Sequence, residues 1–215
     1  MCISGLSFGQ ISEIGFGLGG FSYSGDLTRG YSITSNRPAG TAYFRSNLSD
    51  IISFKAAITA GNISASDDNP IDPFAEMRGA EFSIFVFEAS TTFEYHFLDW
   101  RSDNAVVRWT PYFFVGFGVF GISGEGEKTS EYSNVQPAIP IGVGFKYTLN
   151  PRWYLGLEFG ARKTFFDYID NVSEGDLDVK NFQYGNEFDN DTYYFLGLSL
   201  TYSFYNIPCP TSPYR

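Results

Sequence analysis

The side chains of this sequence that could do acid–base or nucleophilic chemistry are few and stand apart from one another. His96 is the only histidine, and the residues around it do not supply the Ser and Asp partners of a catalytic triad. Glu158 with Arg162, or Glu88 with Glu94, resembles an acid–base pair only superficially. We expect these groups to form interior salt bridges and His96 to be a packed or hydrogen-bonded interior residue. The sequence therefore predicts no catalytic residue.

Carboxylates also gather in two segments, within residues 67–72 and 176–191, where they could attract a divalent cation. Neither segment has the spacing of an EF-hand loop, and there is no His/Cys cluster for zinc. The glycines within residues 15–20 lack the lysine and the following helix of a phosphate-binding loop. We therefore expect solvated acidic loops, a strand with a glycine face, and no metal or other cofactor.

The composition favours strands and turns over helices. Aromatic residues make up 19% of the chain, with 23 Phe and 15 Tyr, and they are accompanied by 23 Gly. The net charge of −10 argues against nucleic-acid binding, which needs clustered Lys and Arg. There is no run of 18 or more apolar residues, so a transmembrane helix is excluded. The chain is predicted to be all-β.

Alternation with a period of two residues predicts eight strands. They cover residues 12–24, 38–47, 51–64, 80–97, 110–122, 136–148, 152–166 and 192–204. The connections after the second, fourth and sixth strands (48–50, 98–109 and 149–151) are predicted to be short, and the others long and polar. Small outer-membrane barrels have this alternation of short periplasmic turns and long external loops. We predict an eight-stranded antiparallel up-and-down transmembrane β-barrel in a bacterial outer membrane.

Within each strand, every second residue (one parity) is apolar, and the residues between them (the other parity) are small or charged. A soluble lipocalin-type barrel would place the apolar parity inside. Eight strands, however, leave an interior barely wide enough for side chains, which suits the glycine-rich parity better. The inward parity then carries four acidic and four basic residues, which should pair with one another. These predicted interior charges are Glu13, Arg45, Lys55, Glu88, Glu94, Lys146, Glu158 and Arg162.

The two ends of the chain and the acidic loops carry further expectations. Residues 1–9 end in a small-x-small pattern and are interpreted as the remnant of a secretory signal. Residues 10–204 would form the barrel and residues 205–215 a periplasmic tail. Cys209 in that tail would be left without Cys2 after cleavage, so it is a candidate for contact with a partner or for a disulfide to another chain. Three long connections (67–78, 124–135 and 167–191) hold 15 of the 24 acidic residues, which makes the external rim acidic.

Blocks of residues along nearly the whole chain resemble the PorG-like outer-membrane proteins of the type IX secretion system of Bacteroidota. The blocks are EIGFGLGG at 13–20, YSGD at 23–26, RPAG at 37–40, TPYF at 110–113, IPIGVGFKY at 139–147, LGLEFGAR at 155–162, TYSF at 201–204 and PCP at 208–210. Each block alone is a weak strand pattern, but their order is fairly specific. The sequence departs from the family in its missing signal start and its long acidic insertion in the last external loop.

The resemblance implies an integral outer-membrane protein without enzymatic activity. It would contact outer-membrane lipid and a periplasmic ring of the lipoprotein PorK and its partner PorN, in a machine that exports proteins and, in gliding members, supports motility. We expect a structural, anchoring role in which the periplasmic turns and the tail engage that ring. An adhesin or ligand-binding barrel that uses the acidic loops is the alternative. A pore is disfavoured because a filled eight-stranded barrel has no aqueous channel.

Overall fold

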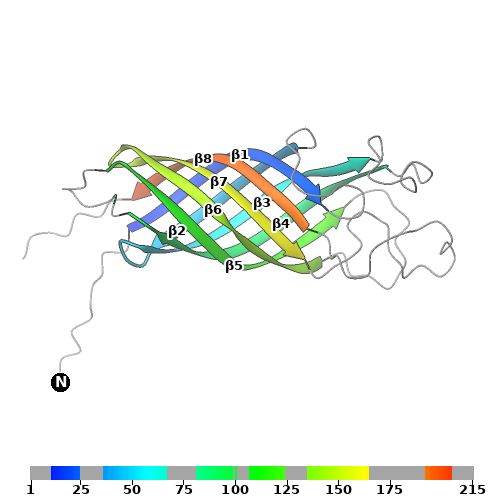
Figure 1. Cartoon of the computed structure of the whole chain (residues 1–215), viewed down its shortest axis with the longest axis horizontal. Helices are drawn as coiled ribbons and strands as arrows, with labels where there is room; N and C mark the ends of the chain where they lie inside the picture. The colour runs from blue at the N-terminus through cyan, green and yellow to red at the C-terminus, as the bar shows by residue number, and fades with distance from the viewer. Residues whose placement is uncertain are drawn as a thin grey trace, which may run out of the picture.

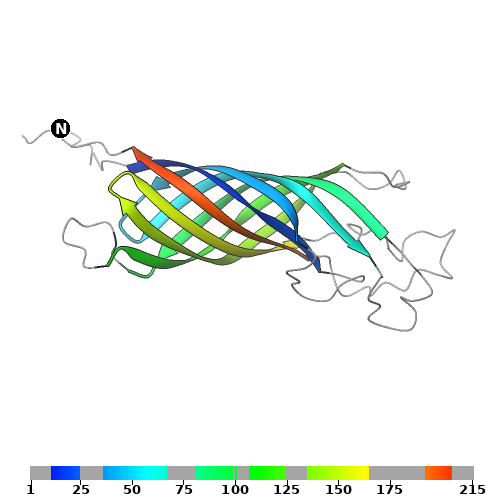
Figure 2. The same cartoon turned by 90° about the horizontal axis from the view of Figure 1, so that it is seen from above.

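The computed structural model describes residues 11–24, 36–66, 81–98, 100, 107–123, 135–164 and 192–204. Eight antiparallel strands, each paired with the next in sequence, close into a barrel through a β1–β8 pairing (Figures 1 and 2). They are β1 (Ile11–Ser24), β2 (Arg37–Asn47), β3 (Ile52–Ser66), β4 (Glu81–His96), β5 (Trp109–Ser123), β6 (Val135–Asn150), β7 (Trp153–Thr164) and β8 (Thr192–Phe204). The predicted barrel is confirmed, and every predicted strand boundary lies within two residues of the observed one. No helix long and apolar enough to cross a membrane occurs in the described ranges.

The connections at one end of the barrel are residues 48–51, 97–108 and 151–152. The last of these is a tight turn in which Asn150 Oδ1 accepts hydrogen bonds from the backbone N–H groups of Arg152 and Trp153, both at 3.0 Å. The prediction that all three connections are short was wrong for the β4–β5 connection. The β4–β5 connection (residues 97–108) is as long as the β1–β2 connection (residues 25–36) at the other end. Trp100, within the β4–β5 connection, is buried.

The start of β1 and the end of β8 lie at this same end, because Ser12 pairs with Phe204. The predictions for residues 1–9, for the tail with Cys209 and for nearly all of the acidic connections fall outside the described residues. By the topology of outer-membrane barrels, the end with the tight turns is the periplasmic end.

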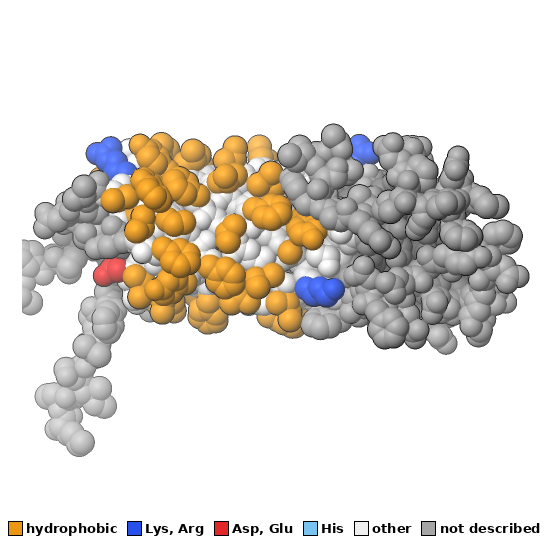
Figure 3. Space-filling model, in the orientation of Figure 1, with side chains coloured by type: hydrophobic (Ala, Val, Ile, Leu, Met, Phe, Trp, Pro, Cys, Tyr) orange, Lys and Arg blue, Asp and Glu red, His pale blue; other side chains and the backbone are white. Residues whose placement is uncertain are grey.

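Large apolar side chains cover the outer surface of the strands. On the face shown in Figure 3 they form a broad belt, and the visible charged side chains lie only at its edges. Members of this belt include Phe16, Leu18, Phe113, Phe117, Val143, Leu157, Leu198 and Leu200. Aromatic pairs border it near the periplasmic end, where Trp109 stacks on Phe145 and Trp153 meets Tyr202 edge-on. An apolar band with such an aromatic girdle is the surface of a barrel that sits in lipid.

Candidate functional site

Eight charged side chains point into the lumen from six of the eight strands, and the sequence had placed the same eight on its inward parity. Seven of them are buried, and the side chain of Glu158 keeps 15% of its surface accessible. β4 and β7 contribute two charges each, and β1, β2, β3 and β6 contribute one each. They are Glu13, Arg45, Lys55, Glu88, Glu94, Lys146, Glu158 and Arg162.

Glu94 is the centre of the larger group of charges. Arg45 Nε lies 3.0 Å from Glu94 Oε2, and Lys146 Nζ lies 2.9 Å from the same oxygen. Lys55 Nζ is 3.7 Å from Glu94 Oε1. Three cations therefore surround one carboxylate in a space closed to bulk water, and this arrangement needs further negative charge to be stable.

Two more carboxylates supply that charge. Arg45 Nη1 donates to Glu13 at 2.9 Å, and Lys55 Nζ donates to Glu158 Oε2. Three acidic and three basic groups then balance, and we call this set (Glu13, Arg45, Lys55, Glu94, Lys146 and Glu158) the Glu94 network. Because the set is neutral, attraction between its opposite charges offsets part of the cost of removing six charges from water.

Uncharged side chains complete the hydrogen bonding of the Glu94 network. Asn47 donates to Glu13 at 2.6 Å, and Ser53 Oγ donates to Asn47 Oδ1 at 2.7 Å. The hydroxyl of Tyr112 donates to Glu158 Oε2 at 3.1 Å. The bond from Asn47 satisfies Glu13 Oε1, which Arg45 does not reach, and the bond from Tyr112 adds a second donor to the Glu158 oxygen that Lys55 contacts.

A second, smaller group lies nearer the external end. Arg162 Nε donates to Glu88 Oε2 at 3.3 Å, and the hydroxyl of Tyr193 donates to the same oxygen at 2.6 Å. Arg162 Nη1 also donates to the backbone carbonyl of Gly160 at 3.0 Å, and its guanidinium lies 5.2 Å from the centre of the Phe195 ring. We call Glu88, Arg162 and Tyr193 the Glu88 network, and it too has no net charge.

His96 is fully buried at the periplasmic end of the Glu94 network. Its Nε2 lies 3.2 Å from Ser53 Oγ, 3.2 Å from Lys146 Nζ and 3.6 Å from a Glu94 oxygen. The sequence analysis did not predict that Ser53 and Glu94 would both lie beside this ring. A triad needs the serine and the carboxylate on different ring nitrogens, whereas here both meet Nε2, so the arrangement is a packed polar contact.

Trp100 closes the periplasmic mouth over this group. Its ring lies 5.9 Å from the His96 ring and meets Tyr154 edge-on at 4.8 Å. Lys146 Nζ lies 5.7 Å from the centre of the Trp100 ring. The β4–β5 connection thus places an aromatic cap, with a cation–π contact, on the charged interior.

Glycines make room for two tyrosine rings inside the lumen. A Cβ on Gly15 would collide with the ring of Tyr43, and a Cβ on Gly144 would collide with the ring of Tyr112. The hydroxyl of Tyr43 reaches Thr201 Oγ1 at 2.6 Å. Aromatic rings laid over inward glycines fill a narrow barrel without straining its wall.

The lumen becomes apolar beyond the Glu88 network. Phe21 meets Tyr193 edge-on at 5.5 Å, and Phe120 meets the same ring at 5.6 Å. We call this buried set the apolar plug, and its members are Phe21, Tyr23, Ala39, Ile63, Ile84, Val86, Phe120, Ile122, Ala138, Tyr193 and Phe195. Both parities are apolar in parts of β4 and β5, so alternation alone did not predict this plug.

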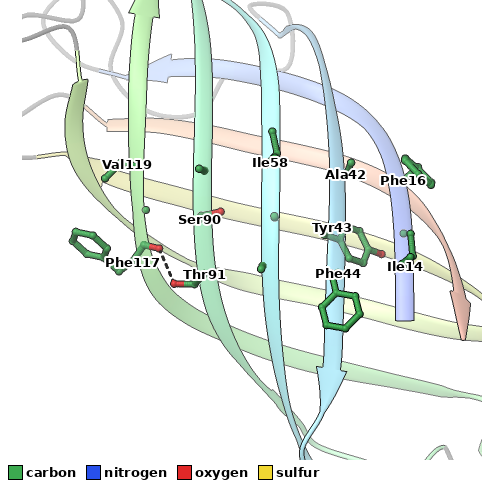
Figure 4. A pocket seen from close by; sticks show the side chains of 15 residues that line it. Ile14, Phe16, Ala42, Tyr43, Phe44, Ile58, Ser90, Thr91, Phe117 and Val119 are labelled. Atoms are coloured by element: carbon green, nitrogen blue, oxygen red, sulfur yellow. Dashed lines mark hydrogen bonds between the residues drawn. The ribbon is translucent and has the colours of Figure 1, made fainter. Parts of the chain in front are cut away.

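The outer surface carries a shallow hollow over β1–β5 (Figure 4). In one row of paired residues, Ala56 and Thr91 lie side by side between the larger Phe44 and Phe117. The hollow is about 610 Å³ in volume and is lined mainly by apolar groups. It belongs to the lipid-facing belt, so acyl chains are what it meets in a membrane.

Several polar residues around the charges were not among the predicted site residues. Tyr43, Asn47, Ser53, Tyr112 and Tyr193 all stand on the inward parity of their strands, so the alternation could have found them. Nothing in the sequence around Trp100 indicates that it enters the barrel. Within the described ranges, no group of three or more His, Cys, Asp or Glu side chains could hold a metal ion.

Comparison with known proteins agrees with this architecture. The sequence profile of a family described as "Domain of unknown function (DUF6089)" matches residues 1–212. The structure is similar to that of Neisserial surface protein A, with a TM-score of 0.56 and 10% identity, over 90% of this chain and 97% of that one. It is also similar to Ail, the attachment invasion locus protein of Yersinia pestis, solved in complex with the heparin analogue sucrose octasulfate. There the TM-score is 0.50 and the identity 11%, over 91% of this chain and 99% of that one.

These likenesses are at the level of the fold, because the sequence identities are low. No curated protein matches the sequence. The closed eight-stranded barrel and its apolar belt are those of an integral protein of the bacterial outer membrane.

Proposed function

The chain belongs to the family described as domain of unknown function DUF6089, and we propose that it is a non-enzymatic outer-membrane anchor of a type IX protein secretion machine. In this role the barrel holds its periplasmic end against a ring of the PorK and PorN type. The resemblance of the ordered sequence blocks to PorG-like proteins of Bacteroidota supplies the identity of the machine. Gliding motility would depend on the same contact in species that glide.

The observation that carries an anchoring role is the filled lumen. The Trp100 cap, the two neutral charge networks and the apolar plug follow one another along the barrel axis. An eight-stranded barrel filled in this way offers no path for solutes. Its useful surfaces are therefore its two rims and its lipid-facing wall, which favours a scaffold over a transporter.

The periplasmic rim has features suited to holding a protein partner. Leu48 and Ile51 are exposed at the β2–β3 turn on either side of Asp50, and Arg108 and Arg152 are exposed at the other two connections. Exposed apolar side chains bordered by charges match the apolar core and polar rim of a protein–protein contact. The rim is also fixed in the membrane by the aromatic girdle, so a partner bound there would be anchored.

Photo-crosslinking in living cells tests the proposed contact. A photoreactive amino acid at Ser49, in the β2–β3 turn, should yield adducts that contain a lipoprotein of the periplasmic ring. The same amino acid at Ser123, exposed at the other end of the barrel, is the matched control and should yield none. The proposal would be overturned if neither position gave adducts to ring proteins and if protein export stayed normal after deletion of the gene. Loss of surface attachment with normal export would point to an adhesin instead.

A further inference from the structure

A small cavity lies in the middle of the lumen, between the two charge networks. It is bordered by Lys55 and Glu158 of the Glu94 network, by Arg162 of the Glu88 network, and by Thr92 of β4. Its space of about 10 Å³ is close to the ~10–15 Å³ that a single buried water molecule needs. The side chain of Glu158, with 15% of its surface accessible, is the least buried of the eight interior charges.

Three polar groups at the cavity have hydrogen-bonding capacity left over. Both hydrogen bonds to Glu158, from Lys55 and from Tyr112, go to Oε2, and among the described residues none goes to Oε1. Arg162 uses Nε for Glu88 and Nη1 for the Gly160 carbonyl, which leaves guanidinium N–H groups for another acceptor. Thr92 Oγ1 is buried, and no described residue hydrogen-bonds to it.

These groups are complementary to one molecule that both donates and accepts. We propose that the cavity is a binding site for a single water molecule, which donates to Glu158 Oε1, accepts from Arg162 and hydrogen-bonds to the hydroxyl of Thr92. Three hydrogen bonds are the usual number for a buried water. No described ion pair joins Glu158 to Arg162, so this water is the link between the two networks.

Charge balance decides in favour of water over an ion. Each network is already neutral, so a sodium or chloride ion would leave an uncompensated charge in an interior of low dielectric constant. A water molecule adds hydrogen bonds and no net charge. Leaving the site dry would leave the buried Thr92 hydroxyl without a hydrogen bond.

The consequence is a continuous polar column that joins the Glu94 network to the Glu88 network. It would run from His96 at the periplasmic end, through Glu94 and Glu158, across the water to Arg162, and end at Tyr193, which is also part of the apolar plug. The inference concerns the interior only and is independent of the proposed secretion role.

High-resolution crystal structures of the full chain test the site, with wild type compared with Thr92→Val and Thr91→Val. Thr91 is the matched control, because it is the neighbouring residue on the same strand but is exposed on the outer face. We expect one spherical density peak at hydrogen-bond distance, roughly 2.7–3.2 Å, from all three groups in wild type and Thr91→Val. The peak should disappear in Thr92→Val.

Three outcomes would overturn the proposal. They are an empty cavity in wild type, a direct Glu158–Arg162 ion pair that closes it, and a peak that anomalous scattering identifies as an ion. If Thr92→Val does not fold, Thr92→Ser keeps the hydroxyl and should keep the peak. Water-to-amide NOEs at residue 92 in nanodiscs provide a measurement without crystals, and their absence in wild type would contradict the site.

Discussion

Arg45 on β2 and Glu94 on β4 meet inside the lumen, with Nε and Oε2 3.0 Å apart, although β3 separates their backbones. Glu94 compensates three cations at once, so its charge should matter more than that of any peripheral partner. We expect Glu94→Gln, which keeps the shape of the side chain, to destabilise the barrel by about 3–5 kcal/mol, the usual cost of breaking a buried ion pair. Urea unfolding in lipid vesicles measures the change.

A compensating variant separates charge from packing in this prediction. Replacing Lys146 by Met together with Glu94→Gln removes one charge of each sign, so the double variant should recover part of the lost stability. Equal stability of wild type and Glu94→Gln would show that the Glu94 network is not a source of stability.

The Gly15–Tyr43 contact predicts a strict requirement for glycine. Gly15→Ala places a methyl group where the Tyr43 ring lies, and we expect a loss of about 1–3 kcal/mol from overpacking. Gly40 is the control, because a Cβ there meets its nearest atom only at 3.9 Å. The temperature at which each variant loses its folded gel mobility would measure the stability of Gly15→Ala and of Gly40→Ala. Comparable mobility changes for Gly15→Ala and Gly40→Ala would contradict the role of the ring.

The lipid-facing belt predicts a cost for charge that depends on depth. Val143 is 54% exposed near the middle of β6, and Leu149 is 48% exposed at its periplasmic end. Val143→Arg should destabilise the barrel by about 2–4 kcal/mol, and Leu149→Arg by at most about 1 kcal/mol. Folding titrations into vesicles give both values, and a reversed order would mean that the membrane is centred elsewhere on the strands.

The filled lumen predicts an electrically silent protein. In planar bilayers we expect no steady single-channel conductance from wild type, since the apolar plug and the charge networks fill the interior. Replacing Phe21, Phe120 and Tyr193 by Ala removes three large rings of the plug. If current still fails to cross this variant, the charge networks alone close the barrel, whereas steady current through wild type would refute the sealed interior.

Much of this architecture could be predicted from the sequence, because a strand in a small barrel exposes alternate residues to two different environments. Glu158 and Arg162 on β7, for example, share a parity opposite to Leu155 and Leu157, and the structure places the first pair inside and the second pair outside. Strand ends were predictable for the same reason, since alternation ceases where polar connections begin.

The pairing of the interior charges could not be predicted in this way. Lys55 meets Glu158 from the opposite side of the barrel, and contacts between strands that are not neighbours depend on strand tilt and stagger rather than on parity. The burial of Trp100 was missed because it follows from the path of a connection, which has no periodic signal. The apolar plug was missed because a strand with two apolar faces has no visible alternation.

The pairing of β1 with β8 also determines when the barrel can close during synthesis and folding. Thirteen residue pairs join the first strand to the last, so a ribosome must finish almost the entire described chain before the final seam has both of its sides. Until then two long strand edges are open, and open edges invite pairing with other chains. A chain that lacks β8 cannot close this barrel, because β1 then has no partner on one edge. We expect such a chain to depend on chaperones or to be degraded.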